Sequence, residues 1–265
     1  MQDLPLAERH ARFAAFRADR AQRPIDGFAL ELEAGYSRHL PRAAGAEALI
    51  CFTSLDAAAL DSAIAAEQQR FAARRQRLEW KVYEFDEPAS LREQLAAAGF
   101  IADEAEAFML YPLDGAAPAS GALPDGLTVR RLTRPEELAE LIALQESVWS
   151  IDLAWLYSQM CERLAHSPER LSVYGAYAGT QLVGTGWTDF PTGSAFAELH
   201  GGAVLPAWRG RGVYRALLAP RVLEAQARGC NWLAVDAAPM SRPIQEALGF
   251  QPVCLSWPMR WAPPA

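Results

Sequence analysis

Residues 204–218, with the sequence VLPAWRGRGVYRALL, decide the fold of this chain. A buried strand from Ala203 to Leu205 breaks at Pro206, and the chain then turns through Gly210 and Gly212 into a helix with one apolar face. Because glycine has no Cβ, the backbone can adopt unusual dihedral angles there and a ligand can come close. The free N–H groups of the turn and of the first helical turn then point outward together, and the helix dipole strengthens the anion site that they form.

The motif Arg209-x-x-Gly212-x-Tyr214 resembles the Arg/Gln-x-x-Gly-x-Gly/Ala loop of the GNAT acetyltransferases, which holds the pyrophosphate of acetyl-coenzyme A. One position departs from the pattern, because Tyr214 stands where the family usually has Gly or Ala. The resemblance implies acetyl-CoA as co-substrate and no metal. It implies cofactor contacts from Val204, Leu205, Arg209, Gly210, Arg211, Gly212, Val213, Tyr214 and Ser241. The alternative is a strand-to-helix turn that uses glycine and binds nothing, with both arginines as solvated side chains.

The elements around the loop have the order expected for a complete GNAT domain of mixed α/β fold, which the resemblance places at 127–265. The pattern predicts strands at 127–132, 171–177, 181–189, 195–205, 231–236 and 253–261, and helices at 135–148, 153–164, 213–228 and 241–248. Thr133 is expected to cap the first of these helices, and Gly179-Thr180 to close a hairpin. Gly249-Phe250 after the last helix agrees with the family pattern.

The first part of the chain, 1–113, reads as a second α/β domain joined by a Pro/Gly-rich linker at 114–126. Its pattern of apolar and polar residues predicts helices at 5–19, 56–77 and 88–98, and strands at 28–33, 48–52, 80–85 and 107–111. Its strand, helix, Gly99-Phe100 and final strand parallel the end of the second domain. This half therefore looks like a degenerate GNAT copy, as in two-domain members similar to mycothiol synthase; an unrelated α/β domain is the alternative.

The junction of this first domain, residues 52–56, has no glycine and carries Asp56. A carboxylate at that turn repels phosphate and occupies the donors at the start of the helix. We therefore expect the first domain to bind no coenzyme A.

The composition of the chain limits the classes of binding partner to be expected. The chain of 265 residues carries 25 basic and 32 acidic residues, and its net charge of −7 argues against nucleic acid or an anionic membrane. The four cysteines are far apart and form no C-x-x-C, as expected for reduced thiols. The start of the chain lacks a signal-like apolar segment, so we expect a cytoplasmic protein, either a monomer or a homodimer.

Two polar residues on one strand are the candidate base. Glu198 and His200 lie two positions apart, so they face the same side of the sheet. Arylalkylamine N-acetyltransferases, relatives in the family, have two histidines at this spacing. Histidine titrates near neutrality, so His200 is the expected base and Glu198 its orienter or the counter-charge of the amine. A simple hydrogen-bonded pair on the sheet surface is the alternative, and Asp236 is either a third candidate base or a helix cap.

The resemblance also assigns carbonyl polarisation to a strand amide near Val204 or Leu205, where the strand splays from its neighbour. Gly201-Gly202 suits the bulge that would produce such splaying. The family usually has a general-acid tyrosine four residues before Gly249, where this chain has Gln245. Tyr214 and Ser241 are possible substitutes.

Aromatic residues are candidates for the wall of the amine site, which the two helices after the linker should form. They are Trp149, Trp155, Tyr157 and Trp187. Core packing is the alternative role for this stripe; a true wall would favour an apolar or aromatic amine, or a cation held against the rings. The sequence thus predicts an N-acetyltransferase acting on a small molecule or peptide amine. Its rivals are a non-catalytic acyl-CoA-binding module, which Gln245 favours, and an α/β interaction protein whose loop is only a turn.

Overall fold

A computed structural model describes residues 4–115 and 124–264 of the chain. Most of the predicted linker lies outside the described residues. The chain forms two compact units: unit 1 combines residues 1–110 with 236–265, and unit 2 comprises residues 111–235. The last helix and strand, expected in the second domain, thus belong to unit 1 with the first part of the chain. The linear division into 1–113 and 127–265 stays a prediction about the two halves of the sequence.

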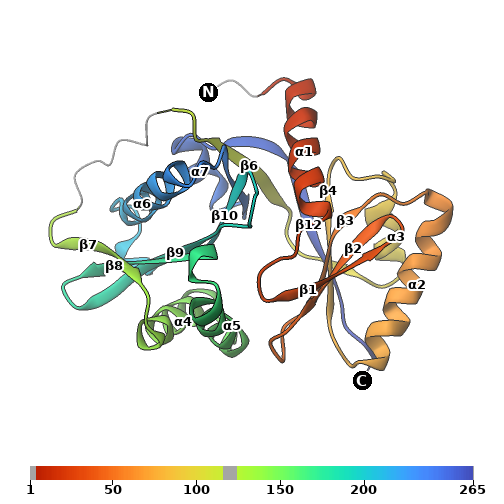
Figure 1. Cartoon of the computed structure of the whole chain (residues 1–265), viewed down its shortest axis with the longest axis horizontal. Helices are drawn as coiled ribbons and strands as arrows, with labels where there is room; N and C mark the ends of the chain where they lie inside the picture. Colours follow the sequence, from red (N-terminus) through yellow and green to blue (C-terminus); the bar gives the residue numbers. More distant parts are fainter. Residues whose placement is uncertain (1–3, 116–123, 265) are drawn as a thin grey trace. The chain divides into compact units, whose positions relative to one another are not determined.

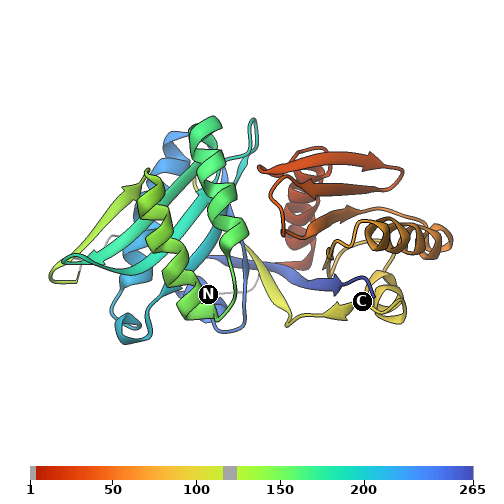
Figure 2. The ribbon, with the colours of Figure 1, turned by 90° about the horizontal axis from the view of Figure 1, so that it is seen from below.

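Unit 2 is a mixed sheet covered by helices on both faces. Its strand order is β7 (Leu127–Leu132), β8 (Leu171–Ala178), β9 (Gln181–Asp189), β10 (Phe196–Val204) and β11 (Trp232–Ala237). The first four strands are antiparallel, and β11 runs parallel to β10. The helix α6 (Val213–Ala227) packs on one face, and α4 (Pro135–Trp149) and α5 (Ala154–His166) pack on the other (Figures 1 and 2). Short 3₁₀ turns lie at Pro168–Arg170 and Pro206–Trp208.

Local sequence signals account for most boundaries in unit 2. Gly179 has a φ of +59° in the β8–β9 hairpin, and Gly229 has a φ of +76° just after α6, so both predicted stops are confirmed. The predicted cap of α4 is wrong. Arg134 occupies the N-cap position, and the Glu137 carboxylate accepts from the N–H groups of Thr133 and Arg134. A helix carboxylate therefore replaces the threonine hydroxyl in closing this end.

The strands of unit 1 also pair in a mixed parallel and antiparallel arrangement. Its strand order is β1 (Phe28–Glu33), β2 (Tyr36–Pro41), β3 (Ala48–Thr53), β4 (Leu78–Tyr83), β12 (Gln251–Trp261) and β6 (Glu106–Pro112), with β5 (Ile101–Ala102) also on β12. Here β3 and β4 pair in parallel, whereas β1 with β2, β2 with β3, and β12 with β4, β5 and β6 pair antiparallel. Its helices are α1 (Leu6–Ala21), α2 (Ala57–Ala73), α3 (Leu91–Ala97) and α7 (Arg242–Ala247). Phe16 of α1 packs on Phe108 of β6, with ring centroids 4.4 Å apart. Leu60 and Ile64 of α2 pack against the core of the same unit.

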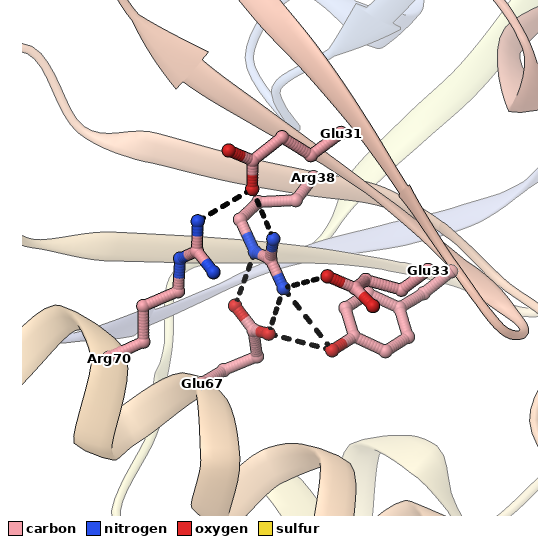
Figure 3. A network of polar contacts seen from close by, with 6 residues as sticks. Glu31, Glu33, Arg38, Glu67 and Arg70 are labelled. Atoms are coloured by element: carbon pink, nitrogen blue, oxygen red, sulfur yellow. Dashed lines mark hydrogen bonds and ion pairs between the residues drawn. The ribbon is translucent and has the colours of Figure 1, made fainter.

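The sequence pattern does not predict β2, because polar residues on both faces of this strand hide its alternation. Arg38 is buried and lies among carboxylates in a network that Figure 3 shows. Its Nε donates to Glu67 of α2 at 2.7 Å, and its Nη2 donates to Glu33 at 3.0 Å and to the other Glu67 oxygen. Glu31 accepts from Arg38 and from Arg70. The buried charges of Arg38 and Glu67 therefore compensate each other in an ion pair.

The two units repeat one structural theme. Each has a strand with a one-residue bulge, a helix after it, and a parallel neighbour that pairs only with the start of the bulged strand. In unit 2, the parallel pairing of β10 with β11 ends at Glu198, and α6 begins at Val213. In unit 1, the parallel pairing of β3 with β4 ends at Ile50, and α2 begins at Ala57. Unit 1 therefore has no room for a loop like 206–212. Asp56 holds the N-cap position there without a side-chain hydrogen bond, so its expected occupation of the helix donors is wrong.

Candidate functional site

The opening between β10 and β11 is the central feature of unit 2. The two strands pair from Phe196 to Glu198, against residues 232–234, and the ladder stops there. On its other side, β10 continues to pair with β9 as far as Val204. The second half of β10 therefore presents one edge without a strand partner to the gap, as the family resemblance implies.

A bulge in β10 determines which amide faces this gap. The register with β9 shifts between His200 and Ala203, so the predicted bulge at Gly201-Gly202 is confirmed. Beyond it, the N–H of Leu205 donates to Val183 at 3.0 Å and is not available, which contradicts Leu205 as a donor to a ligand. Because N–H groups alternate along a strand, the N–H of Val204 points away from β9, toward the gap. Val204 is thus the amide placed for that role.

The loop after β10 carries its N–H groups outward. Gly210 and Gly212 have φ values of +73° and +80°, and Gly212 is the N-cap of α6. Positive φ explains these glycines, since nothing lies within 4 Å of a Cβ at either position. Among residues 4–115 and 124–264, no acceptor takes a hydrogen bond from the N–H groups of Gly210, Arg211, Gly212 or Val213. Four adjacent donors and a helix N-terminus form a cradle that suits phosphate oxygens.

The side chains of the loop are arranged around this cradle. Arg209 donates through Nε to the Val204 carbonyl at 3.2 Å, and Arg211 lies over the ring of Trp208 at 5.1 Å. Tyr214, the departure from the family pattern, is accommodated by a glycine on the strand: a Cβ at Gly202 would lie 2.7 Å from its ring. The larger residue in the loop is therefore matched by a smaller one in the bulge.

The structure brings Glu198 and His200 together with a third polar residue. His200 Nε2 lies 3.9 Å from the Glu198 carboxylate and 3.8 Å from that of Asp189 on β9. Asp189 also pairs at 3.0 Å with Arg163, which is buried in α5. His200 is 40% exposed and stacks on Trp187 at a centroid distance of 6.2 Å. Asp189 was not expected from the sequence, because only the pairing of β9 with β10 reveals it.

A buried glutamine is the second residue that the sequence did not indicate. Gln145 of α4 donates through Nε2 to the carbonyl of Gly201 at 2.6 Å and to Thr185 Oγ1 at 2.7 Å. Its Oε1 accepts from the indole N–H of Trp149 at 3.0 Å. A glutamine inside an amphipathic helix looks like an ordinary polar residue in sequence, so no local signal could have identified it.

The predicted aromatic wall separates into different roles. Trp149 is 41% exposed at the end of α4, and Ile151 beside it is 52% exposed. Trp155 and Tyr157 are partly buried against the core under α4 and α5, and Trp187 is a buried member of that core. Of the four aromatic residues, Trp149 presents the most accessible ring.

Three further candidates lie in unit 1. Asp236 accepts from Ser256 at 2.7 Å and pairs with Lys81 at 3.5 Å, and α7 has no side-chain cap, so the expected helix cap is wrong and the role as a third base stays a prediction. Ser241 is the N-cap of the short helix α7, without a side-chain cap. Gln245 is buried in that helix. The cofactor contact expected from Ser241, and the lack of a general-acid tyrosine at Gln245, stay predictions.

Within residues 4–115 and 124–264, no three His, Cys, Asp or Glu side chains are grouped so that they could bind a metal ion. In the same residues, no helix combines the length and the apolar character that crossing a membrane requires.

Comparison with known proteins adds to this geometry. Residues 135–250 match the model of the acetyltransferase (GNAT) family. A mycothiol acetyltransferase from Thermobifida fusca is 33% identical over 134 residues, which are 48% of this chain and 40% of that protein. The alignment thus spans well under two thirds of the curated relative.

Solved structures share the fold over almost the whole chain. A GCN5-related N-acetyltransferase from Kribbella flavida has a TM-score of 0.67 at 15% identity, covering 100% of this chain and 97% of its own. A tandem GNAT protein from the clavulanic acid biosynthesis pathway has a TM-score of 0.65 at 16% identity, covering 98% and 96%. Residues 135–250 thus match the model of the acetyltransferase (GNAT) family, and the chain shares its fold with a GCN5-related N-acetyltransferase and with a tandem GNAT protein.

Proposed function

We propose that this protein is an acetyl-CoA-dependent N-acetyltransferase that transfers an acetyl group to a primary amine of a small molecule or peptide by direct attack. The observation that supports this most is the gap between β10 and β11, with the Val204 amide facing it and the loop Gly210–Val213 beyond its end. The family match over 135–250 agrees with the proposal. The four cysteines form no disulfide among the described residues, which agrees with the cytoplasmic location that we propose as well.

Acetyl-CoA fits the residues that are present. The amides of Gly210, Arg211, Gly212 and Val213 are donors without partners in the described chain, and a pyrophosphate supplies the acceptors that they lack. The open space around the two glycines allows this close approach. The exposed side chain of Arg211 can add a charged contact.

Val204 is the proposed donor to the acetyl oxygen. Its N–H points into the gap and is held by a strand that pairs with β9 on the opposite edge. A donor of this kind stabilises the negative charge that develops on the oxygen when the amine attacks, and one such donor is typically worth about 3–4 kcal/mol of barrier.

His200 is the proposed base. The amine nitrogen forms a bond to the thioester carbon, the C–S bond breaks, and the amine proton passes to His200. Glu198 and Asp189 flank Nε2 at 3.9 and 3.8 Å and attract the positive charge that a protonated imidazole carries. Arg163 holds Asp189 from the other side, so the carboxylate is oriented before the reaction begins.

The departing thiolate receives no obvious proton donor, because Gln245 stands at the usual tyrosine position. A general acid contributes typically 10²–10⁴-fold, and a thiol with an ordinary pKa of about 8.5 leaves tolerably without one. We therefore expect the transfer to be slower than in an enzyme that has this general acid.

The acceptor amine is proposed to lie against the exposed ring of Trp149. A cationic or aromatic amine suits that surface best.

Unit 1 is proposed to bind no coenzyme A. Its corresponding strand end is engaged by the protein itself, since Thr53 accepts from the buried indole of Trp80 at 2.8 Å and from Arg17. The N–H of Ser54 donates to Gly35 at 2.6 Å. The donors and the space that unit 2 offers are therefore used for packing in unit 1.

The test is calorimetric binding of CoA and acetyl-CoA, followed by a turnover screen across an amine library that detects released thiol. Binding with one site per chain and transfer to at least one amine class supports the proposal. Binding without transfer to any amine would favour a non-catalytic acyl-CoA-binding module, for which Gln245 is the argument. An unchanged melting temperature with CoA would favour an interaction protein instead.

A further inference from the structure

The side-chain amide of Gln145 connects three elements of unit 2. It lies in α4, is 2% exposed, and bonds to the carbonyl of Gly201 in the β10 bulge and to Thr185 in β9. The indole of Trp149 can only donate, so the atom that faces it at 3.0 Å must be the amide oxygen. Trp149 therefore determines the orientation in which the amide nitrogen donates to Gly201 in the bulge and to Thr185 on β9.

The carbonyl of Gly201 is the point at which β10 changes phase. Gly201 has a φ of +58° and accepts from Gln145 at 2.6 Å and from Thr185 Oγ1 at 3.3 Å. One extra residue in a strand reverses which of the following N–H groups face its neighbour. Because the bulge lies between His200 and Ala203, it decides that Val204 rather than Leu205 faces the gap.

We propose that Gln145 is a positioning residue, which holds the bulge through the Gly201 carbonyl and thereby aims the Val204 amide at the acetyl oxygen. Trp149 orients Gln145 in turn. This inference rests on the proposed function, and it assigns a purpose to a buried amide that the loop and the base do not involve. It also links the exposed ring at the end of α4 to the polarising donor through two hydrogen bonds.

The test measures polarisation directly and needs no acceptor. The bound carbonyl of acetyl-CoA, labelled with ¹³C, is observed by isotope-edited infrared difference spectroscopy in wild type, Gln145→Met and Trp149→Phe. Methionine has a similar volume but cannot donate, and phenylalanine keeps the ring but loses the indole N–H. Gln159→Met, at a buried glutamine of α5, is the matched control for removing a buried amide.

We expect a carbonyl band shifted to lower frequency on binding to wild type and to Gln159→Met. The shift should be lost in Gln145→Met and reduced in Trp149→Phe, while CoA affinity, which depends on the loop, is unchanged in all variants. Equal bands in wild type and Gln145→Met would overturn the inference, and so would a wild-type band at the frequency of free acetyl-CoA. If Gln145→Met does not fold, the band of Trp149→Phe decides.

The two proposals fail in different ways. A shifted wild-type band with no turnover on any amine would leave the positioning role standing and remove the transferase. Turnover in wild type, with a carbonyl band in Gln145→Met that is shifted as far as in wild type, would do the reverse. Absence of acetyl-CoA binding to wild type would overturn both.

Discussion

The ring of Trp187 occupies the space that a side chain on Gly201 would need: a Cβ built there lies 1.6 Å from Cζ3 of the indole. Gly201 lies in the bulge that sets the direction of the Val204 N–H. The ring of Trp187 also stacks with the imidazole of His200. One glycine therefore allows both the conformation of the bulge and the packing beneath the proposed base.

Gly201→Ala is expected to lower the free energy of unfolding by about 2–4 kcal/mol, because a left-handed non-glycine residue and an overpacked ring each carry a cost. Urea titration measures this change. The control is Gly179→Ala, which has nearly the same φ, +59°, and nothing within 4 Å, so it reports the backbone cost alone. Equal losses in the two variants would show that Trp187 is not the constraint.

Gly212→Asp is expected to weaken CoA binding by at least ~10²-fold, because it places a carboxylate among the donors of the loop, against a pyrophosphate. Calorimetry with CoA measures the affinity. Gly212→Ala introduces the same positive-φ strain without charge and should weaken binding much less. An unchanged affinity in the aspartate variant would contradict the placement of the phosphates at this loop.

His200→Ala should reduce turnover at neutral pH by about 10²–10⁴-fold, since it removes the group that accepts the amine proton. Its affinity for CoA should equal that of wild type, because the loop is untouched. The matched control is His166→Ala, an exposed histidine that bonds to the Glu162 carbonyl in α5. Normal turnover in His200→Ala would remove this residue from the mechanism.

Arg38→Met should destabilise the protein by about 3–5 kcal/mol, because Glu67 is left charged and buried without its partner. Adding Glu67→Met removes the stranded charge, and the double variant should regain much of the loss. Denaturant unfolding of the two single variants and the double variant measures the coupling. Arg92→Met, at an exposed pair with Glu93, should change stability little. Simple additivity of the two core variants would argue against a coupled pair.

His39 should make stability depend on pH. Burial lowers the pKa of His39 from 6.5 to about 4, against the opposing effect of its bond to the Arg23 carbonyl. Between these values the unfolded chain binds a proton that the folded protein does not, so stability present above pH 6.5 is lost as the pH falls through this window.

Once the pH has fallen through the whole window, the free energy of unfolding lost because of His39 is at most about 3 kcal/mol. It is measured as the difference in unfolding free energy between wild type and His39→Gln from pH 7 to pH 4. His166→Gln is the control at an exposed site. Burial also raises the pKa of Asp86 to about 7, which acts in the opposite direction, so the difference between variants is the informative quantity. A flat difference would contradict a neutral, buried His39.

Local signals in the sequence determined a large part of this protein. The glycines of the loop, the hairpin at Gly179 and the amphipathic spacing of α2 each act over a few residues. The order of helices and strands after residue 127 and the location of the loop could therefore be predicted. The pair Glu198 and His200 followed from the period of two along a strand.

Contacts between distant residues decided the rest. The phase of the bulge transfers the donor role from Leu205 to Val204, and no sequence pattern reports which N–H a neighbouring strand takes. Asp189 meets His200 only because β9 pairs with β10, and Gln145 reaches Gly201 only because α4 packs on that sheet. Register and packing are settled by tertiary burial, in which a shift of one residue exchanges the two faces of a strand. The sequence alone therefore determines where the loop lies, whereas the direction of the Val204 N–H toward the gap depends on the strand pairing of the folded sheet.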